Sequence, residues 1–151
     1  MRTLKKTAMK LIVMSDTHFR AFGAAEAEKI DIIMQRKPNI VIHLGDFVHP
    51  NLYDYLYSFS AEFYAVAGNC DGSELRRRLP LEYLLEREGK RFLLTHGAAF
   101  SNEKRLHKFL RQQKGSIDFL LFGHWHLPFH EKIEGIDVVN PGSLQYNRND
   151  K

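Results

Sequence analysis

The sequence predicts a mixed α/β fold whose sheets carry helices on their outer faces. In the first half of the chain, short apolar runs alternate with longer helical patterns, as in βαβ units. In the second half, apolar runs are joined by short turns, as in β-hairpins. The chain of 151 residues, 44% hydrophobic and 26% charged, has the length and composition of one globular domain. These features together favour mixed sheets with helices outside them.

Short apolar runs mark the expected strands, and several are nearly continuous in β-branched or aromatic residues, as buried strands are. Six of these runs are Lys10–Met14, Ile40–Leu44, Glu62–Ala67, Arg91–Leu94, Phe119–Phe122 and Ile136–Val139. Two further strands, Tyr83–Leu85 and Phe129–Ile133, precede the turn dipeptides Glu88-Gly89 and Glu134-Gly135. Each dipeptide predicts a tight hairpin turn.

Three segments are expected to be helices. Ala24–Gln35 is rich in helix formers and is followed by Pro38, which ends the pattern. Asn51–Phe59 places its apolar residues on one face, and Asn51 is the expected N-cap. Ser101–Gln113 carries a third stripe of buried positions.

The composition excludes some classes of protein and favours others. One cysteine, Cys70, rules out an intramolecular disulfide and suits a cytoplasmic protein. We find no apolar run near the roughly 18 residues that a membrane span needs. We expect one domain over residues 1–151, with residues 1–8 as a frayed tail.

The charge distribution gives little sign of a nucleic-acid partner. The net charge of +4 is mild and favours anionic partners only weakly. The densest basic cluster, Arg76-Arg77-Arg78, is better explained as a solvated loop than as a polyanion site. Nucleic acid is therefore an improbable partner.

Residues that can bind metal stand where the predicted strands end. They are Asp16, His18, Asp46, Asn69, His96, His124 and His126. In α/β sheets, the crevice at the carboxyl ends of the strands is where ligands bind. Each pair of such residues is weak evidence alone, but seven of them at five strand ends predict one shared metal site.

These ligand types indicate the metals and the chemistry. Carboxylate oxygen and imidazole nitrogen suit Mn, Fe, Co, Ni or Zn, and a single cysteine cannot form a multi-thiolate site. Seven ligands exceed the needs of one ion but suit two ions bridged by a carboxylate. Two divalent ions, two aspartates and one hydroxide leave about +1, which would attract a phosphate ester.

The ordered motifs resemble those of calcineurin-like metallophosphoesterases. The motifs are Asp16-Thr17-His18, Gly45-Asp46, Gly68-Asn69-Cys70-Asp71, His96-Gly97 and Gly123-His124-Trp125-His126. Asn140-Pro141-Gly142-Ser143, followed by Arg148, is similar to the ending of the small prokaryotic phosphodiesterases of that superfamily. The resemblance implies a four-layer α-β-β-α sandwich with a dinuclear centre at one edge of the sheets.

The resemblance also implies residue roles. One ion would be bound by Asp16, His18, Asp46 and His126, and the other by Asp46, Asn69, His96 and His124. Asp46 would bridge the ions, which would most readily be manganese. A hydroxide between them would attack a phosphodiester, with Asp46, His96 and Asn69 as catalytic residues and Asn69 and Cys70 in contact with substrate.

This chain departs from the family pattern at three positions. Cys70 replaces a histidine proposed to protonate the leaving group, and a thiol of pKa near 8.5 is a weak acid for that purpose. Phe19 stands where glycine is common, and Asn147 stands where proline is common. The same fold also serves as a retromer subunit, so a catalytically weak interaction scaffold is the alternative function.

Four other residues are weighed separately. His43 lies inside a predicted strand and is expected to be a core histidine. His49 follows Asp46 closely and could reach the site to transfer a proton. Tyr53 and Tyr57 are expected to point away from the apolar stripe of their helix, and so to be exposed.

Overall fold

A computed structural model describes residues 7–147 of the chain, and its elements alternate as the sequence predicts. In order they are β1 (Leu11–Met14), α1 (Ala24–Met34), β2 (Ile40–His43), α2 (Pro50–Tyr57), β3 (Glu62–Ala65), α3 (Ser73–Arg78), β4 (Glu82–Arg87), β5 (Lys90–Thr95), α4 (Glu103–Gln113), β6 (Phe119–Phe122), β7 (Pro128–Ile133) and β8 (Ile136–Pro141). Arg148 and most of the expected N-terminal tail lie outside the described residues. In the described part, no helix is long and apolar enough to cross a membrane.

The strands form two sheets. One has the order β1-β2-β3, and the other has the order β4-β5-β6-β8-β7. In the second sheet, β5, β6 and β8 are parallel, while the edge strands β4 and β7 are antiparallel to their neighbours. The first sheet is parallel throughout rather than mixed, because α1 and α2 provide the crossovers between its strands.

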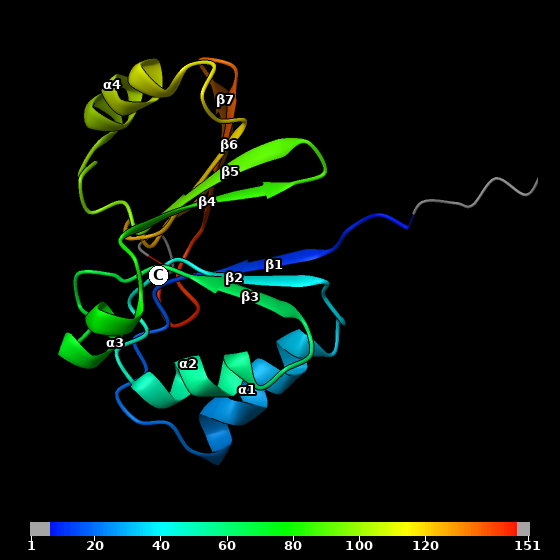
Figure 1. Cartoon of the computed structure of the whole chain (residues 1–151). Helices are drawn as coiled ribbons and strands as arrows, with labels where there is room; N and C mark the ends of the chain where they lie inside the picture. The colour runs from blue at the N-terminus through cyan, green and yellow to red at the C-terminus, as the bar shows by residue number, and fades with distance from the viewer. Residues whose placement is uncertain (1–6, 148–151) are drawn as a thin grey trace, which may run out of the picture.

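The molecule has four layers (Figure 1): α1 and α2 lie below the three-stranded sheet, and α4 lies above the five-stranded sheet. One apolar cluster, which includes Ile30, Leu52 and Val41, packs α1 and α2 on the first sheet. A second, with Leu106 and Leu120, packs α4 on the other sheet. A third cluster joins residues of both sheets. The expected α-β-β-α sandwich is confirmed.

The local predictions are largely confirmed. The observed strands end within about two residues of the predicted bounds, and both hairpins are present. Glu88-Gly89 and Glu134-Gly135 have positive φ angles at both positions, as a two-residue hairpin of the favoured hand requires.

Helix α2 begins earlier than predicted. Its N-cap is His49, whose Nδ1 accepts the Asn51 N–H at 3.2 Å, and Pro50 occupies the first turn. The expected cap Asn51 is therefore inside the helix. Proline at the first helical position is the signal that places the start correctly.

Helix α3 is absent from the sequence prediction, which treats Arg76-Arg77-Arg78 as a solvated loop. These arginines form the last turn of α3. The helix has six residues and one buried side chain, Leu75, so it shows no periodic pattern. Arg78 pairs with Asp54 at 2.7 Å, so part of the cluster is engaged in surface contacts.

The two tyrosines of α2 differ in exposure. Tyr57 is 68% exposed, as expected. Tyr53 is only partly exposed and packs against Phe47 and Phe63, so the expectation of an exposed residue is wrong for this position. The apolar layer under the first sheet extends farther around α2 than its helical stripe indicates.

Candidate metal centre

The predicted ligands stand in tight turns that follow the strands. Five of them have positive φ angles, which side chains with a Cβ rarely adopt: Asp16 (52°), His18 (47°), Asp46 (58°), His124 (67°) and His126 (52°). Such conformations cost about 1–3 kcal/mol each and persist where surrounding contacts impose them. Their concentration at one edge of the sheets is typical of a functional site.

The first two ligand loops are hydrogen-bonded to each other beyond the ends of their strands. The N–H of Asp16 donates to the carbonyl of Gly45, and the N–H of His18 donates to the carbonyl of Asp46, both at 3.0 Å. From the other end of the chain, the Ser143 hydroxyl donates to the carbonyl of Asp16 at 2.7 Å. These bonds hold the strained turns in place.

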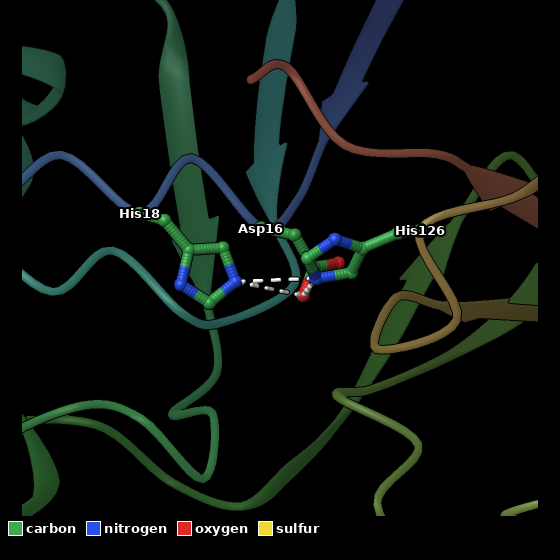
Figure 2. A group of neighbouring side chains, drawn as sticks. All are labelled: Asp16, His18 and His126. Atoms are coloured by element: carbon green, nitrogen blue, oxygen red, sulfur yellow. Dashed lines mark hydrogen bonds and ion pairs between the residues drawn. The ribbon is translucent and has the colours of Figure 1, made fainter. Parts of the chain in front are cut away.

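The Asp16 carboxylate is fully buried and has one oxygen without a hydrogen bond. Its Oδ2 accepts the Ser15 hydroxyl at 2.7 Å and the His124 N–H at 2.9 Å. Its Oδ1 is buried with no hydrogen-bond partner. Figure 2 shows the rings of His18 and His126 directed at this carboxylate, with Nε2 atoms 3.7 and 3.2 Å from Oδ1. An unpartnered buried carboxylate oxygen facing imidazole nitrogens suits a cation.

Asp46 lies between the two groups of histidines. Its Oδ2 is 3.4 Å from Nε2 of His18 and 3.2 Å from Nε2 of His96. Its Oδ1 accepts the Cys70 N–H at 2.8 Å. Burial on its own raises the pKa of Asp46. The hydrogen bond and charge of His96, with the hydrogen bond from the Cys70 N–H, outweigh burial and lower the pKa to about 2. Asp46 is therefore an ionised carboxylate.

His96 is oriented by a backbone acceptor. Its Nδ1 lies 2.7 Å from the carbonyl of Leu44, which can only accept, so Nδ1 carries the proton. In the neutral ring, Nε2 is then unprotonated and its lone pair can bind a metal ion. This Nε2 atom lies 3.3 Å from Nδ1 of His124. Burial lowers the pKa of His96, but the hydrogen bond and charge of Asp46 outweigh this and raise it.

The spacing of these donor atoms fits metal ligation. Ligand atoms that are each about 2.1 Å from one ion lie roughly 3–4 Å from one another. Five distances join a carboxylate oxygen to a histidine Nε2 atom, with Oδ1 of Asp16 or Oδ2 of Asp46 as the oxygen. They run from 3.2 to 3.9 Å. Asp16, His18 and His126 form one compact group, and Asp16, Asp46 and His96 form another. Carboxylate and imidazole donors at this spacing suit a divalent transition metal.

Asn69 is the predicted ligand with the least direct connection to the others. Its side-chain amide donates to Sγ of Cys70 at 3.5 Å, and its backbone carbonyl accepts a hydrogen bond from the Arg76 guanidinium. The Cys70 thiol is exposed, and Sγ lies within 4.8 Å of ligand atoms of His18 and Asp46. Burial and the negative charge of Asp46 raise the pKa of Cys70. Cys70 is thus beside the centre, as the sequence predicts.

Two histidines outside the predicted ligand set, His43 and His49, have structural contacts. His43 is fully buried and stacks on Phe47 with ring centres 3.5 Å apart, so the prediction of a core histidine is confirmed. Its Nε2 lies 3.2 Å from the Thr17 hydroxyl. Burial, with the charge of His96, lowers the pKa of His43 to about 3. The ring of His49 caps α2 through Nδ1, and a proton-transfer role for it stays a prediction.

One important residue of the site has no predicted role. Asp71 is buried, and its Oδ2 accepts the N–H groups of Asp46 and Gly68 at 2.9 and 2.7 Å. Its Oδ1 accepts the N–H of Val48 at 2.9 Å. Asp71 therefore joins the loop after β2 to the loop after β3. The signal in the sequence is the aspartate that ends the Gly68-Asn69-Cys70-Asp71 motif.

Two glycines allow the loops to approach the carboxylates. A Cβ on Gly68 would lie 2.1 Å from Oδ1 of Asp46. A Cβ on Gly123 would lie 1.9 Å from Oγ of Ser15 and 2.7 Å from Oδ2 of Asp16. Any side chain at either position would displace a carboxylate of the centre.

Comparisons with known proteins agree with this arrangement. Residues 9–151 match the model of the calcineurin-like phosphoesterase superfamily domain. A probable metallophosphoesterase of Mycoplasma pneumoniae is 35% identical over 93% of this chain and 82% of its own length. The phosphodiesterase YfcE of Escherichia coli K12 is 30% identical over 90% of this chain and 79% of its own length.

Solved structures share the fold. The structure of wild-type Vps29 of Entamoeba histolytica, determined in complex with zinc, superposes with a TM-score of 0.74. It is 23% identical and covers 95% of this chain and 80% of its own, so this likeness shows the fold alone. On the family match and the close relatives, the chain belongs to the calcineurin-like phosphoesterase superfamily.

Proposed function

We propose that the protein is a metal-dependent phosphodiesterase whose centre holds two divalent ions. The observation that carries this proposal is the pair of buried carboxylates, Asp16 and Asp46, surrounded by histidines from the ends of several strands. Oδ1 of Asp16 has no hydrogen-bond partner, and Oδ2 of Asp46 lies between His18 and His96. Buried charge of this kind calls for a compensating cation.

In this proposal, two ligand sets share one carboxylate. Asp16, His18, Asp46 and His126 would hold the first ion, and Asp46, Asn69, His96 and His124 would hold the second. The position of Oδ2 of Asp46 between Nε2 atoms of the two sets supports its role as the bridge. Manganese is the ion we favour, and Fe, Co, Ni and Zn suit the same donors.

The chain's own residues then prepare a phosphoryl group for reaction. When bound, the ions supply Lewis acidity toward a phosphoryl oxygen and lower the pKa of a coordinated water. Asp46 and His96 would position the ions, and Asn69 and Cys70 would face the substrate. The named activity of the relative YfcE supports a diester as substrate. A cytoplasmic location is part of the proposal, since the exposed Cys70 thiol suits a reducing compartment.

The test is hydrolysis of a panel of phosphate diesters and monoesters after the protein is loaded with manganese. We expect turnover of diesters and close to two ions per chain by elemental analysis. Asp46→Asn should lose both ions and activity together, because Asp46 faces both ligand sets. Wild-type metal content and turnover in Asp46→Asn would contradict the dinuclear proposal.

The alternative is an interaction scaffold with a weak or inactive centre, which the likeness to the Vps29 fold keeps in view. The complete set of ligand types at the predicted positions favours catalysis instead. The same experiment separates the two, because a scaffold would bind metal without hydrolysing any ester of the panel.

A further inference from the structure

Two of the clefts that border the candidate metal centre differ in character. The Leu81 cleft has a volume of about 590 Å³, and its walls include Ala67, Leu81, Ala98 and Ala99 beside Asn69 and His96. The Arg20 cleft has a volume of about 430 Å³ and is lined by Arg20, Cys70, Ser143 and Tyr146 beside His18 and His126. Volumes of this size suit small organic groups.

The two clefts also differ in the charged residues that line them. In the Leu81 cleft, the positive charge of Arg76 is matched by the negative charge of Glu82. Among the described residues that line the Arg20 cleft, Arg20 is basic and none is acidic, while Glu26 lines a neighbouring cleft that also includes Arg20. The first cleft therefore suits a neutral group, and the second suits a group that carries or develops negative charge.

The apolar wall of the Leu81 cleft is held in place. The Phe100 N–H donates to the carbonyl of Gly97 at 3.1 Å, which closes a turn with Ala98 and Ala99 at its tip. Phe100 is buried, and its carbonyl accepts the indole N–H of Trp125 at 2.8 Å. The turn therefore presents its two alanines to the cleft without needing to rearrange.

A second part of the lining is anchored through the chain before β4. The N–H of Ala67 donates to the carbonyl of Pro80 at 2.9 Å, next to Leu81. Leu81 itself is 72% exposed, the largest exposed fraction among the large apolar side chains of the described residues. An apolar group bound in the cleft would cover this side chain, which would remove apolar surface from water.

A phosphodiester has two organic groups, and hydrolysis treats them differently. The bond from phosphorus to the leaving oxygen breaks, water supplies the new oxygen on phosphorus, and a proton reaches the departing oxygen. Negative charge develops on the leaving oxygen, so the positive Arg20 cleft suits the leaving group. The retained ester group keeps its bond and stays neutral.

On the basis of the proposed function, we propose that the Leu81 cleft binds the retained ester group of the substrate and selects diesters in which that group is apolar, such as an aryl group. The juxtaposition that carries the proposal is an anchored apolar cleft open beside Asn69 and His96, with a positive cleft on the other side of the centre.

The test compares two diesters that share a leaving group. Methyl 4-nitrophenyl phosphate and phenyl 4-nitrophenyl phosphate both release 4-nitrophenolate, and they differ only in the retained group. With the manganese-loaded protein, we expect kcat/KM to be at least about tenfold higher for the phenyl ester, after correction for the uncatalysed rates. A ratio near one would overturn the proposal.

Three variants assign the preference to the cleft. Leu81→Ser and Ala98→Gln should lower the phenyl-to-methyl ratio toward one, because each makes the wall less apolar. Ile32→Ser is the matched control, since Ile32 is a 59% exposed apolar residue on α1 and lines neither cleft. A ratio unchanged in both cleft variants would overturn the proposal. So would equal losses on the two esters, because the cleft would then hold the leaving group.

A binding measurement keeps this proposal separate from the proposed activity. Calorimetry with phenylphosphonate and methylphosphonate needs no turnover. We expect roughly tenfold tighter binding of phenylphosphonate to the manganese-loaded protein, and loss of that preference in Leu81→Ser. If no ester were hydrolysed but this preference were present, the proposed function would fail and the cleft assignment would stand. Equal binding of the two phosphonates would overturn the cleft assignment whatever the activity.

Discussion

The carboxylate of Asp71 accepts the backbone N–H of Asp46 at 2.9 Å. The same carboxylate also accepts hydrogen bonds from the N–H groups of Gly68 and Val48. One buried side chain therefore joins the loop after β2 to the loop after β3. Together with the backbone bonds between the loops after β1 and β2, this contact helps to maintain the positive φ angle of Asp46.

Asp71→Asn should weaken the centre without removing a ligand. The amide has one acceptor oxygen in place of two, so at least one of the three N–H groups loses its acceptor, at a cost of about 1–3 kcal/mol when that group is buried. We expect lower stability in urea unfolding and weaker manganese binding by titration. Asp54→Asn, which alters an exposed surface pair, is the control and should change stability by less than about 1 kcal/mol. Unchanged metal affinity in Asp71→Asn would show that the loops do not depend on this contact.

Gly68→Ala should displace the carboxylate of Asp46. The new Cβ would lie 2.1 Å from Oδ1 and 2.3 Å from the backbone nitrogen of Asp46, so the two loops must move apart. We expect a loss of stability of about 1–3 kcal/mol or more, with reduced metal content by elemental analysis. Gly72→Ala is the matched control, because a Cβ there would have no neighbour within 4 Å. Equal metal content in the two variants would contradict the close approach.

His43 should make the fold less stable as the pH falls. Its pKa is about 3 in the folded protein and about 6.5 when unfolded, so below pH 6.5 the unfolded chain gains a proton that the folded chain does not. Stability contributed by neutral His43 is therefore complete above pH 6.5 and declines by about 1.4 kcal/mol per pH unit between roughly pH 5.5 and 4.

The measurement is urea unfolding of metal-free protein at several pH values. His43→Asn should remove this part of the pH dependence, although the variant is less stable overall because the stacking on Phe47 is lost. His130→Asn, at an exposed position, is the control and should keep the wild-type slope. Identical slopes in His43→Asn and the wild type would contradict the neutral buried ring.

Cys70 should leave the protein without a strong acid for the leaving group. Burial and Asp46 raise the pKa of its thiol, which makes it a poor proton donor. We expect kcat/KM to depend steeply on leaving-group pKa across substituted phenyl and alkyl diesters, since a placed general acid is typically worth about 10²–10⁴-fold. Cys70→His should flatten this dependence. A shallow slope in the wild type, with chemistry as the limiting step, would mean that another group already provides the proton.

Much of the fold can be predicted from the sequence, because its signals are local. Apolar runs such as Phe119–Phe122 coincide with strands, and the Glu88-Gly89 and Glu134-Gly135 turns depend on two adjacent residues each. The order of ligand types after the strands also predicts where the centre lies, since parallel strands end at a common edge. Helix α3 cannot be predicted in this way, because six residues are too few to show the periodic apolar pattern of a helix.

The tertiary structure alone decides how the centre is held and what surrounds it. Oδ2 of Asp16 accepts the N–H of His124 from 108 positions along the chain, and no local pattern reports such a contact. The role of Asp71 and the contrast between the Leu81 and Arg20 clefts arise in the same way, from loops that meet only after the two sheets pack. Residue type and spacing determine which chemistry is available, whereas the unpartnered oxygen of Asp16 and the anchored cleft walls depend on distances that exist only in the folded chain.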